Sequence, residues 1–317
     1  MVLASVMLAA PRLARGAPAT VLRIGYSSGT TGQLGEGARI MAERLQALTE
    51  GRVQIDSYPQ SQLGGDLDML QAMERGTLDM TINAALSSFV PELGIFEVPF
   101  LFRDIAHAHA VLDGPIGQAA LRRLEARQLV GLSWGENGLR HITTTARQIR
   151  GPADMAGLKL RSAPSQAILT TFKTLGAEAA MLPFGELYAA LAAGRFEAQE
   201  NPIGTIESAG LWQVQKFISL TGHVYSPAGL VISRHSLERL SAADRAALEQ
   251  AARDGAQASR RAAVLAQQNG LARLRDRGMT VIEVDRTAFA RALAPAEAAF
   301  ATMFGAEQLA AIRAVKA

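Results

Sequence analysis

The stretch that decides the fold begins with Gly-Leu-Lys-Leu-Arg at residues 157–161 and ends with Arg-Phe-Glu-Ala-Gln-Glu-Asn-Pro at residues 195–202. Apolar and basic side chains alternate in the first segment, which predicts a short strand. Ser165 is placed to cap a helix that begins at Gln166. We therefore expect Arg161 at the carboxyl end of a strand, where open α/β sheets bind ligands. A planar guanidinium there suits a carboxylate, which it can hold through two parallel hydrogen bonds.

Taken alone, Arg161 is more simply read as a solvated arginine at a strand end, because most arginines are exposed. The rest of the stretch favours a site. One helix ends at Gly176, and another begins near Pro183 and ends at Gly194. A second short strand, 196–199, then leads into Glu-Asn-Pro. This alternation of strands and helices predicts an α/β fold.

Composition limits the function classes. The chain has 317 residues, enough for two domains, with 49% hydrophobic and 19% charged residues, which are globular values. Its 32 basic and 29 acidic residues nearly balance, and they form no basic run, so nucleic acid is not expected as a partner. The absence of cysteine excludes disulfides, thiol catalysis and thiolate-bound metals.

The first residues predict an export signal. Residues 1–10 are apolar but too short to span a bilayer, and Ala-Pro-Ala at 17–19 has the small-x-small form of a leader-peptidase site. Arg12 and Arg15 lie on the wrong side of the apolar run, which suggests a true start upstream. The alternative is an unstructured N-terminal extension. We predict a leader over residues 1–19.

Two similar units indicate a two-lobed protein. Residues 69–82 and 187–200 both read as a helix, a glycine, an acidic residue and a strand. Chain crossings between the lobes are expected near the turn-like 136–138 and before the strand 230–233. A capping box at Ser241 starts a helix that runs to about Arg277, roughly 50 Å at 1.5 Å per residue, longer than one lobe.

The chain resembles a known family along nearly its whole length. The resemblance is carried in order by Ser-Gln-Leu-Gly-Gly at 61–65, Val-Pro-Phe-Leu-Phe at 98–102, Glu-Asn-Gly-Leu-Arg at 136–140, and the segments 157–161, 183–188, 199–202 and 214–216. These segments resemble the solute-binding proteins of tripartite ATP-independent periplasmic (TRAP) transporters, the dicarboxylate-binding DctP type.

The resemblance implies a fold and a function. The fold is a type II periplasmic-binding-protein-like α/β fold, with mixed sheets flanked by helices and a long helix bracing both lobes. Lobe I would comprise 20–138 and 227–266, and lobe II 139–226 and 267–317, with the ligand cleft between them. The protein would be a periplasmic monomer that captures a small organic acid and delivers it to the membrane subunits of a TRAP transporter.

The resemblance also implies site residues. Arg161 would bind the substrate carboxylate, assisted by Arg140 and Asn201. Asn83 occupies a position that varies with substrate. Three aromatic residues are candidates for the pocket wall, although ordinary core packing explains each equally well: Trp134, Phe184 and Trp212. Residues 27–33 lack the proline and histidine that many members have there, so the acid itself is not identified.

Evidence for catalysis is weak. Motifs of serine hydrolases and zinc proteases are missing, and His107 and His109 would point about 200° apart on a helix. Glu136 and Glu200 are an acid–base pair only if the fold brings them together. We predict no enzyme, cofactor or metal. The alternatives are a lyase or hydrolase acting on a carboxylate in a similar cleft, and a periplasmic sensor module.

Overall fold

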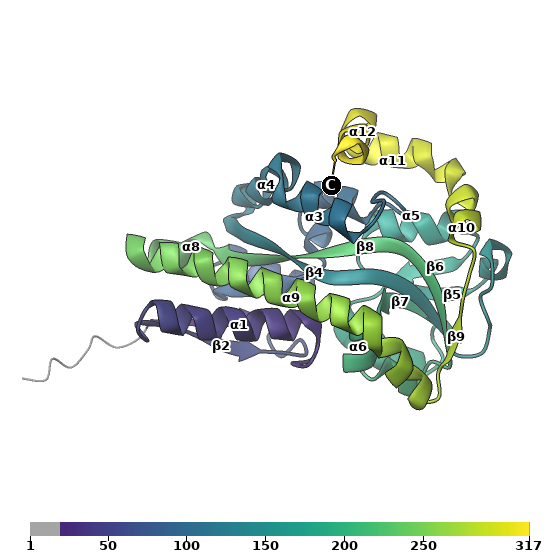
Figure 1. Cartoon of the computed structure of the whole chain (residues 1–317), viewed down its shortest axis with the longest axis horizontal. Helices are drawn as coiled ribbons and strands as arrows, with labels where there is room; N and C mark the ends of the chain where they lie inside the picture. Colours follow the sequence, from purple (N-terminus) through teal and green to yellow (C-terminus); the bar gives the residue numbers. More distant parts are fainter. Residues whose placement is uncertain (1–19, 317) are drawn as a thin grey trace, which may run out of the picture.

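Within residues 20–316, which the computed structural model describes, nine strands form one mixed sheet along the length of the molecule (Figure 1). The predicted leader lies outside the described residues. The sheet order is β2-β1-β3-β8-β4-β7-β5-β6, and β9 pairs with β8. The strands are β1 (Thr20–Gly25), β2 (Val53–Tyr58), β3 (Met80–Asn83), β4 (Leu129–Thr144), β5 (Lys159–Ser162), β6 (Glu178–Met181), β7 (Ala198–Pro202), β8 (Phe217–Ser233) and β9 (Thr280–Ile282).

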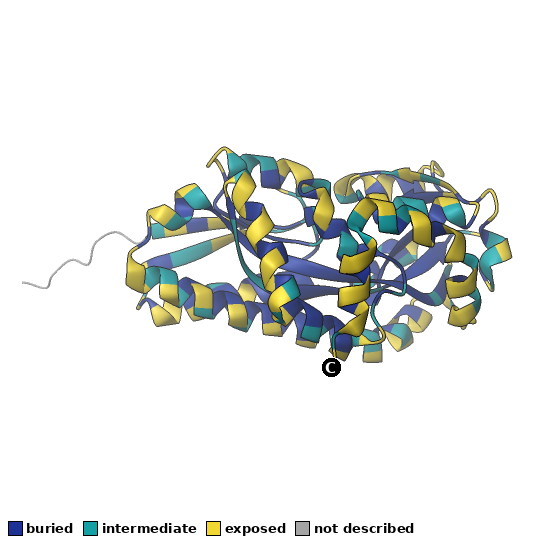
Figure 2. Cartoon of the chain, turned by 90° about the horizontal axis from the view of Figure 1, so that it is seen from above, coloured by how far each residue is buried: buried dark blue, intermediate teal, exposed yellow. Residues whose placement is uncertain are grey.

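The helices lie on both faces of this sheet (Figures 1 and 2). They are α1 (Gln33–Leu48), α2 (Asp66–Glu74), α3 (Ile105–Asp113), α4 (Pro115–Arg122), α5 (Gln166–Thr174), α6 (Phe184–Ala192), α7 (Ile203–Ser208), α8 (Arg234–Glu238), α9 (Ala242–Asp276), α10 (Arg286–Ala292), α11 (Glu297–Phe304) and α12 (Ala306–Ala314). Short 3₁₀ turns occur between them, including η2 (Pro91–Glu97).

Two long strands, β4 and β8, join the two ends of the sheet. The sequence predicted separate strands on either side of 136–138 and a loop before 230. Instead, β4 and β8 pair antiparallel from Leu129–Ser233 to Thr144–Phe217. The pairing shifts register at 131/133, 136/138 and 140/142. These irregularities let β4 continue as one strand without a turn. The chain therefore crosses between the lobes in the middle of unbroken strands.

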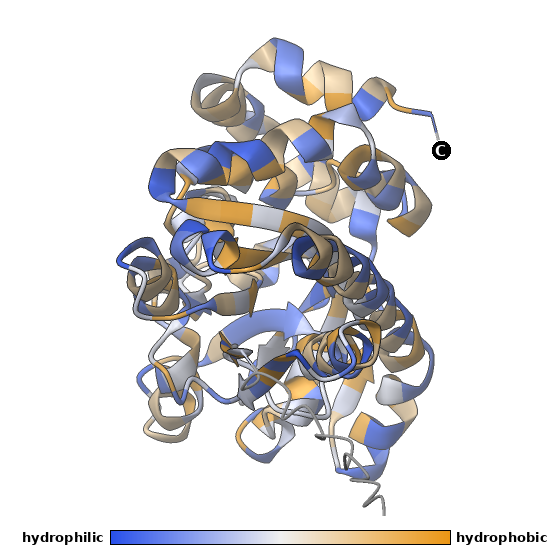
Figure 3. Cartoon of the chain, turned by 90° about the vertical axis from the view of Figure 1, so that its left-hand side faces the viewer, coloured by the Kyte–Doolittle hydropathy of each residue, from blue (hydrophilic) through white to orange (hydrophobic). Residues whose placement is uncertain are grey.

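Each end of the sheet is a lobe with its own core. The first lobe holds the parallel strands β1, β2 and β3, and its apolar residues include Leu22, Ile24 and Met41. The second lobe holds β5, β6 and β7, with separate buried clusters around Phe172 and Ile206. The strands are largely buried, whereas each helix carries both hydrophobic and hydrophilic residues (Figures 2 and 3). The predicted two-lobed α/β fold is confirmed.

The long helix α9 braces both lobes, as predicted. Ser241 caps it by accepting a hydrogen bond from the Asp244 N–H at 3.1 Å, and it continues for 35 residues. It packs against α1 and β4 and, farther along, against α7 and β9. It approaches α1 closely at a glycine pair, since a Cβ added at Gly255 would lie 2.7 Å from the carbonyl oxygen of Gly37.

Candidate functional site

A small cavity lies between the lobes where β5, β7 and the crossing strand β4 meet the loops of the first lobe. Its volume is about 40 Å³, room for only a few water molecules. An organic acid would need the lobes to separate. The lining residues are Ser27, Ser28, Leu34, Asp66, Ala84, Ala85, Asn137, Arg140, Arg161, Ala163, Pro164, Phe184, Asn201 and Thr205.

The lobes meet at small residues on both sides of this cavity. A Cβ on Gly32 would lie 3.0 Å from Ser208 Oγ, and one on Gly185 would lie 3.4 Å from Ser61 Oγ. Residues 32 and 61 belong to the first lobe, and residues 185 and 208 to the second. The two rims are therefore in contact, which is the geometry of a closed binding protein.

Arg161 lies at the predicted position, at the carboxyl end of β5 and just before α5, which Ser165 caps. Its side chain is 1% exposed, not solvated as composition suggested. Nε and Nη2 donate to the Leu182 carbonyl oxygen at 2.9 and 2.7 Å. These bonds fix the guanidinium, and its Nη1 makes no hydrogen bond among the described residues. Burial is the main cause that lowers the pKa of Arg161 to about 10, so it stays charged at neutral pH.

Arg140 forms a buried ion pair with Glu200 on the neighbouring strand β7. Nε donates to Oε2 of Glu200, and Nη2 donates to Oε1 at 2.8 Å and to the Asn201 Oδ1 at 3.2 Å. His223 Nε2 lies 3.5 Å from Glu200 Oε2. Burial acts to raise the pKa of Glu200, but the Arg140 charge and the His223 hydrogen bond outweigh it and lower that pKa to about 2.

Asn201 is fixed by a chain of side-chain hydrogen bonds. Its Nδ2 donates to Gln199 Oε1 at 2.6 Å, and Gln199 Nε2 donates to Thr143 Oγ1 at 2.8 Å. Thr143 in turn donates to Gln215 Oε1 at 2.9 Å. The amide predicted to touch substrate therefore lines the cavity with its orientation set by β7 and β4, while its oxygen also steadies Arg140.

Asp66 was not anticipated from the sequence. It is the first residue of α2 and lines the cavity, and its Oδ1 is buried without a hydrogen-bond partner among the described residues. Burial raises the pKa of Asp66, opposed by a hydrogen bond from Ser27 and the charge of Arg161. Ser28 Oγ, also lining the cavity, is buried and unpartnered as well. The sequence feature that could have indicated Asp66 is an acidic residue directly after Gly64-Gly65 at the start of a helix.

The other predicted site residues divide into two groups. Phe184, at the start of α6, lines the cavity. Asn83, Trp134 and Trp212 do not. Asn83 accepts from the Ala85 N–H at 2.7 Å and so shapes the segment beside the cavity. Trp134 is a core residue whose Nε1 donates to the Gly117 carbonyl oxygen at 2.9 Å, and Trp212 lies under the Arg277 guanidinium at 5.1 Å.

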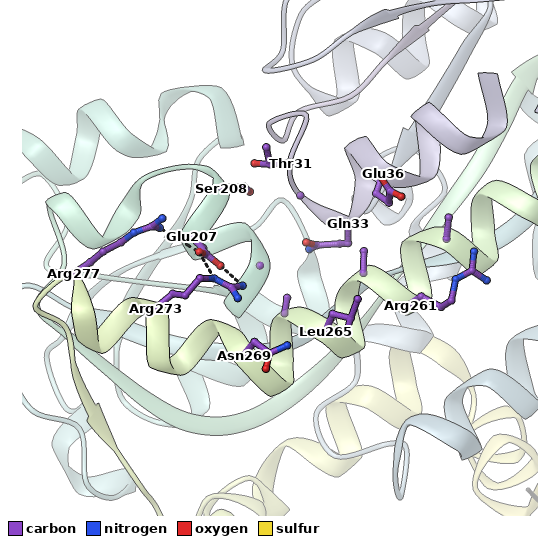
Figure 4. A pocket seen from close by; sticks show the side chains of 15 residues that line it. Thr31, Gln33, Glu36, Glu207, Ser208, Arg261, Leu265, Asn269, Arg273 and Arg277 are labelled. Carbon is purple, nitrogen blue, oxygen red and sulfur yellow. Dashed lines mark hydrogen bonds and ion pairs between the residues drawn. The ribbon is translucent and has the colours of Figure 1, made fainter. Parts of the chain in front are cut away.

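A larger groove of about 780 Å³ lies outside this cavity, between α1, α7 and α9 (Figure 4). Gln33 lines the groove and is hydrogen-bonded to two residues that line the cavity. Its Nε2 donates to the Asn137 carbonyl oxygen at 2.5 Å and to Thr205 Oγ1 at 2.9 Å, which joins α1 to α7. On the groove side, Arg273 pairs with Glu207 at 2.6 Å (Figure 4).

The described residues contain no helix that is both long and apolar enough to cross a membrane. Across the same range, 20–316, no three His, Cys, Asp or Glu side chains gather as a metal site would require. Glu136 and Glu200 do not form an acid–base pair. Glu136 contacts His109 Nε2 at 2.7 Å and Tyr225, whereas Glu200 contacts Arg140.

Comparisons with known proteins identify the family. Residues 24–303 match the family model of the bacterial extracellular solute-binding protein family 7, DctP. A TRAP periplasmic solute-binding protein from Polaromonas sp. JS666, solved with bound D-erythronate, is 42% identical with a TM-score of 0.91, over 94% of this chain and 99% of that one. A TRAP periplasmic solute-binding protein from Bordetella, whose ligand density is assigned to pantoate, is 39% identical with a TM-score of 0.92, over 94% of this chain and 100% of that one.

A further relative is the 2,3-diketo-L-gulonate-binding periplasmic protein YiaO of Escherichia coli, 36% identical over 86% of this chain and 84% of that protein. This family membership rules against the lyase or hydrolase alternative, since these are binding proteins. The chain belongs to the bacterial extracellular solute-binding protein family 7 and is a periplasmic solute-binding protein of the TRAP type.

Proposed function

We propose that this protein captures a small hydroxylated monocarboxylate, a sugar acid, and delivers it as a monomer to the membrane subunits of a TRAP transporter. The observation that carries the proposal is the buried Arg161 guanidinium, which lines the cavity and is held by Leu182 through Nε and Nη2 only. A carboxylate at this guanidinium gains two charge-assisted hydrogen bonds in a site screened from water. Arg140 and Asn201 assist from the adjoining strands.

Asp66 supports a hydroxylated monoacid rather than a dicarboxylate. Arg140 is paired with Glu200, whereas Arg161 and Asp66 both line the cavity without such a partner. One ligand carboxylate is tolerated beside Arg161, but a second would meet the unpartnered Asp66 oxygen. A ligand hydroxyl, in contrast, would donate to the Asp66 oxygen, so that both the hydroxyl and the carboxyl oxygen gain a hydrogen-bond partner. Erythronate, pantoate and diketogulonate, the acids named for the three relatives, are all hydroxylated monocarboxylates.

A binding screen tests the ligand class. The mature protein would be titrated by calorimetry with D-erythronate, pantoate and galactonate, with succinate as the dicarboxylate and erythritol as the uncharged polyol. A ligand at 100 times its Kd should also stabilise the protein by about 2.7 kcal/mol in thermal unfolding. At least one hydroxy acid should bind more tightly than succinate, and erythritol should not bind. Tighter binding of succinate would contradict the assignment of Asp66.

Delivery to the membrane is tested separately. Proteoliposomes containing TRAP membrane subunits should take up the labelled acid only when the binding protein is present. Uptake that is independent of the protein would contradict the delivery role while leaving the ligand class intact. Light scattering that gives the mass of a single chain, with and without ligand, would agree with a monomer.

A further inference from the structure

A second pocket, of about 410 Å³, lies beneath the segment 100–106 that joins η2 to α3. Its other walls come from β4 at Leu139, from β8 at residues 222–225 and from α10 at Arg286. It shares no lining residue with the cavity between the lobes. The volume falls in the range of ordinary small-molecule sites, and nothing in the proposed transport role requires it.

Most of the pocket wall is apolar. Phe102 contacts Tyr225 edge to face at 5.4 Å between ring centroids, and Phe100, Ile105 and Leu139 complete the apolar surface. Phe102, Phe100, Ile105 and Leu139 are only partly buried, and each packs with one side against the hydrophobic core. Such a wall favours an aromatic or branched hydrocarbon body.

The pocket also has a fixed cation. Arg286 donates from Nε to the Thr221 carbonyl oxygen at 3.2 Å and from Nη2 to the Gly222 carbonyl oxygen at 3.1 Å. Gly222 has φ +50, and a Cβ there would lie 3.1 Å from Arg286 Cζ, so glycine lets the strand pass under the guanidinium. Within residues 20–316 no carboxylate pairs with Arg286, its Nη1 makes no hydrogen bond, and the residue is exposed at the edge of the pocket.

Two further charged residues line the pocket, Asp104 and Arg103, so with Arg286 the formal charge of the lining is one positive charge. The Asp104 carboxylate accepts from the His107 N–H at 2.7 Å as the N-cap of α3. Arg103 donates to the carbonyl oxygens of Arg313 and Val315, both at 2.8 Å, which adds a second cation. The pocket is therefore apolar within and positive at its edge.

The segment over the pocket is held in an unusual conformation. Phe100 has φ +52, which is rare for a bulky residue without glycine's freedom. Its N–H donates to the His223 carbonyl oxygen at 2.9 Å, and its ring lies 6.0 Å from the Arg286 guanidinium. Strained residues of this kind gather at ligand-binding segments.

We propose that this pocket is a second binding site, for a small amphiphilic monoanion with an aromatic or branched apolar body and one carboxylate. The carboxylate binds at Arg286, and the body packs among Phe100, Phe102, Leu139 and Tyr225. The site differs in chemistry from the cavity between the lobes, where polar groups surround the ligand and hydroxyls are favoured.

The probe is 2-naphthoate, titrated into the mature full-length protein by calorimetry, beside its uncharged analogue 2-naphthalenemethanol. Arg286→Met removes the proposed anchor. Arg291→Met is the matched control, since it removes an exposed arginine from the same helix, outside the pocket. Arg161→Met disables the cavity between the lobes, which separates the two sites.

We expect naphthoate to bind the wild type, Arg291→Met and Arg161→Met with affinities within about twofold of one another. Arg286→Met should bind it at least about tenfold more weakly, and the alcohol should bind the wild type at least about tenfold more weakly than the acid. The proposal is overturned if naphthoate fails to bind at millimolar concentration, if Arg161→Met abolishes its binding, or if the acid and the alcohol bind equally. The comparison of acid and alcohol needs no variant, so it holds even if Arg286→Met folds poorly.

Discussion

Arg140 on β4 donates to both carboxylate oxygens of Glu200 on β7, and neither side chain is more than 4% exposed. The second arginine of the cavity thus carries its own counter-ion. Arg161, by contrast, donates two hydrogen bonds to the uncharged carbonyl oxygen of Leu182. Of these two arginines, only Arg140 is paired with a carboxylate, which is why we propose Arg161 as the residue that binds a ligand carboxylate.

Removing the counter-ion should destabilise the protein. Glu200→Gln leaves Arg140 buried and unpaired, so we expect a loss of about 3–5 kcal/mol in the free energy of unfolding. Urea denaturation measures it. The matched control is Glu197→Gln, which removes an exposed carboxylate 3.9 Å from Arg147 and should change stability by less than about 0.5 kcal/mol. Equal effects of the two substitutions would show that the buried pair contributes little.

Arg161→Ala should weaken binding of the acid found by the screen by roughly 30-fold to several-thousand-fold, because a buried charge pair is lost. Arg161→Lys should lose much of the affinity too, since an ammonium cannot donate along two parallel bonds. Arg195→Ala, an exposed arginine beside Phe196, is the control. Calorimetric titration of each variant with that acid measures the affinities. Binding within about threefold of wild type by Arg161→Ala would mean that another residue holds the carboxylate.

Asp66→Asn should change ligand preference. The substitution removes the negative charge that opposes a second carboxylate, so the ratio of succinate affinity to hydroxy-acid affinity should rise by about tenfold or more. Asp56→Asn, on the exposed part of β2, is the matched control and should leave the ratio unchanged. An unchanged ratio in Asp66→Asn would place the discrimination elsewhere.

Gln33 should act in closure. Its hydrogen bond to Thr205 Oγ1 joins α1 to α7 of the second lobe, and this bond requires the lobes to be in contact. Gln33→Leu should therefore weaken ligand binding by roughly tenfold with little effect on unfolding. Gln46→Leu, exposed on the same helix, is the control.

X-ray scattering should show a smaller radius of gyration of the wild type with ligand than without. An unchanged radius at saturating ligand would indicate a preformed rigid site. Ligand affinity in Gln33→Leu equal to wild type would mean that the amide does not help to close the lobes.

Acid should destabilise the protein in part through His141. Burial lowers the pKa of His141 to about 3 from an ordinary value of 6.5. The unfolded chain therefore binds a proton that the folded chain does not, and stability is lost as the pH falls from 6.5 towards 3. By about pH 4.5 this amounts to about 2–3 kcal/mol. In His141→Asn the amide oxygen can still accept from the Gly222 N–H. Between neutral pH and about pH 4.5, this variant should therefore lose about 2–3 kcal/mol less unfolding free energy than the wild type. Parallel pH curves would contradict this.

Local patterns determined much of the fold before any tertiary contact was known. Alternation at 157–161 and the caps at Ser165 and Ser241 depend on neighbouring residues, and each appears in the structure. The position of Arg161 at the end of β5 followed from the same local order. Periodicity and capping are short-range properties of the chain, so the sequence alone carries them.

Only the tertiary structure decided how these pieces meet. The burial of Arg161, the pairing of Arg140 with Glu200 and the unpartnered oxygen of Asp66 depend on strands and loops far apart in the chain. The same holds for β4, where pairing with β8 turned an expected turn at 136–138 into a bulge. Trp134 and Trp212 were candidates for the pocket wall, but neither lines the cavity. The residue type alone does not distinguish a pocket wall from a packed core. The hydrogen-bond partner of a side chain and its exposure to solvent are set by packing between distant segments. No local sequence pattern encodes that packing.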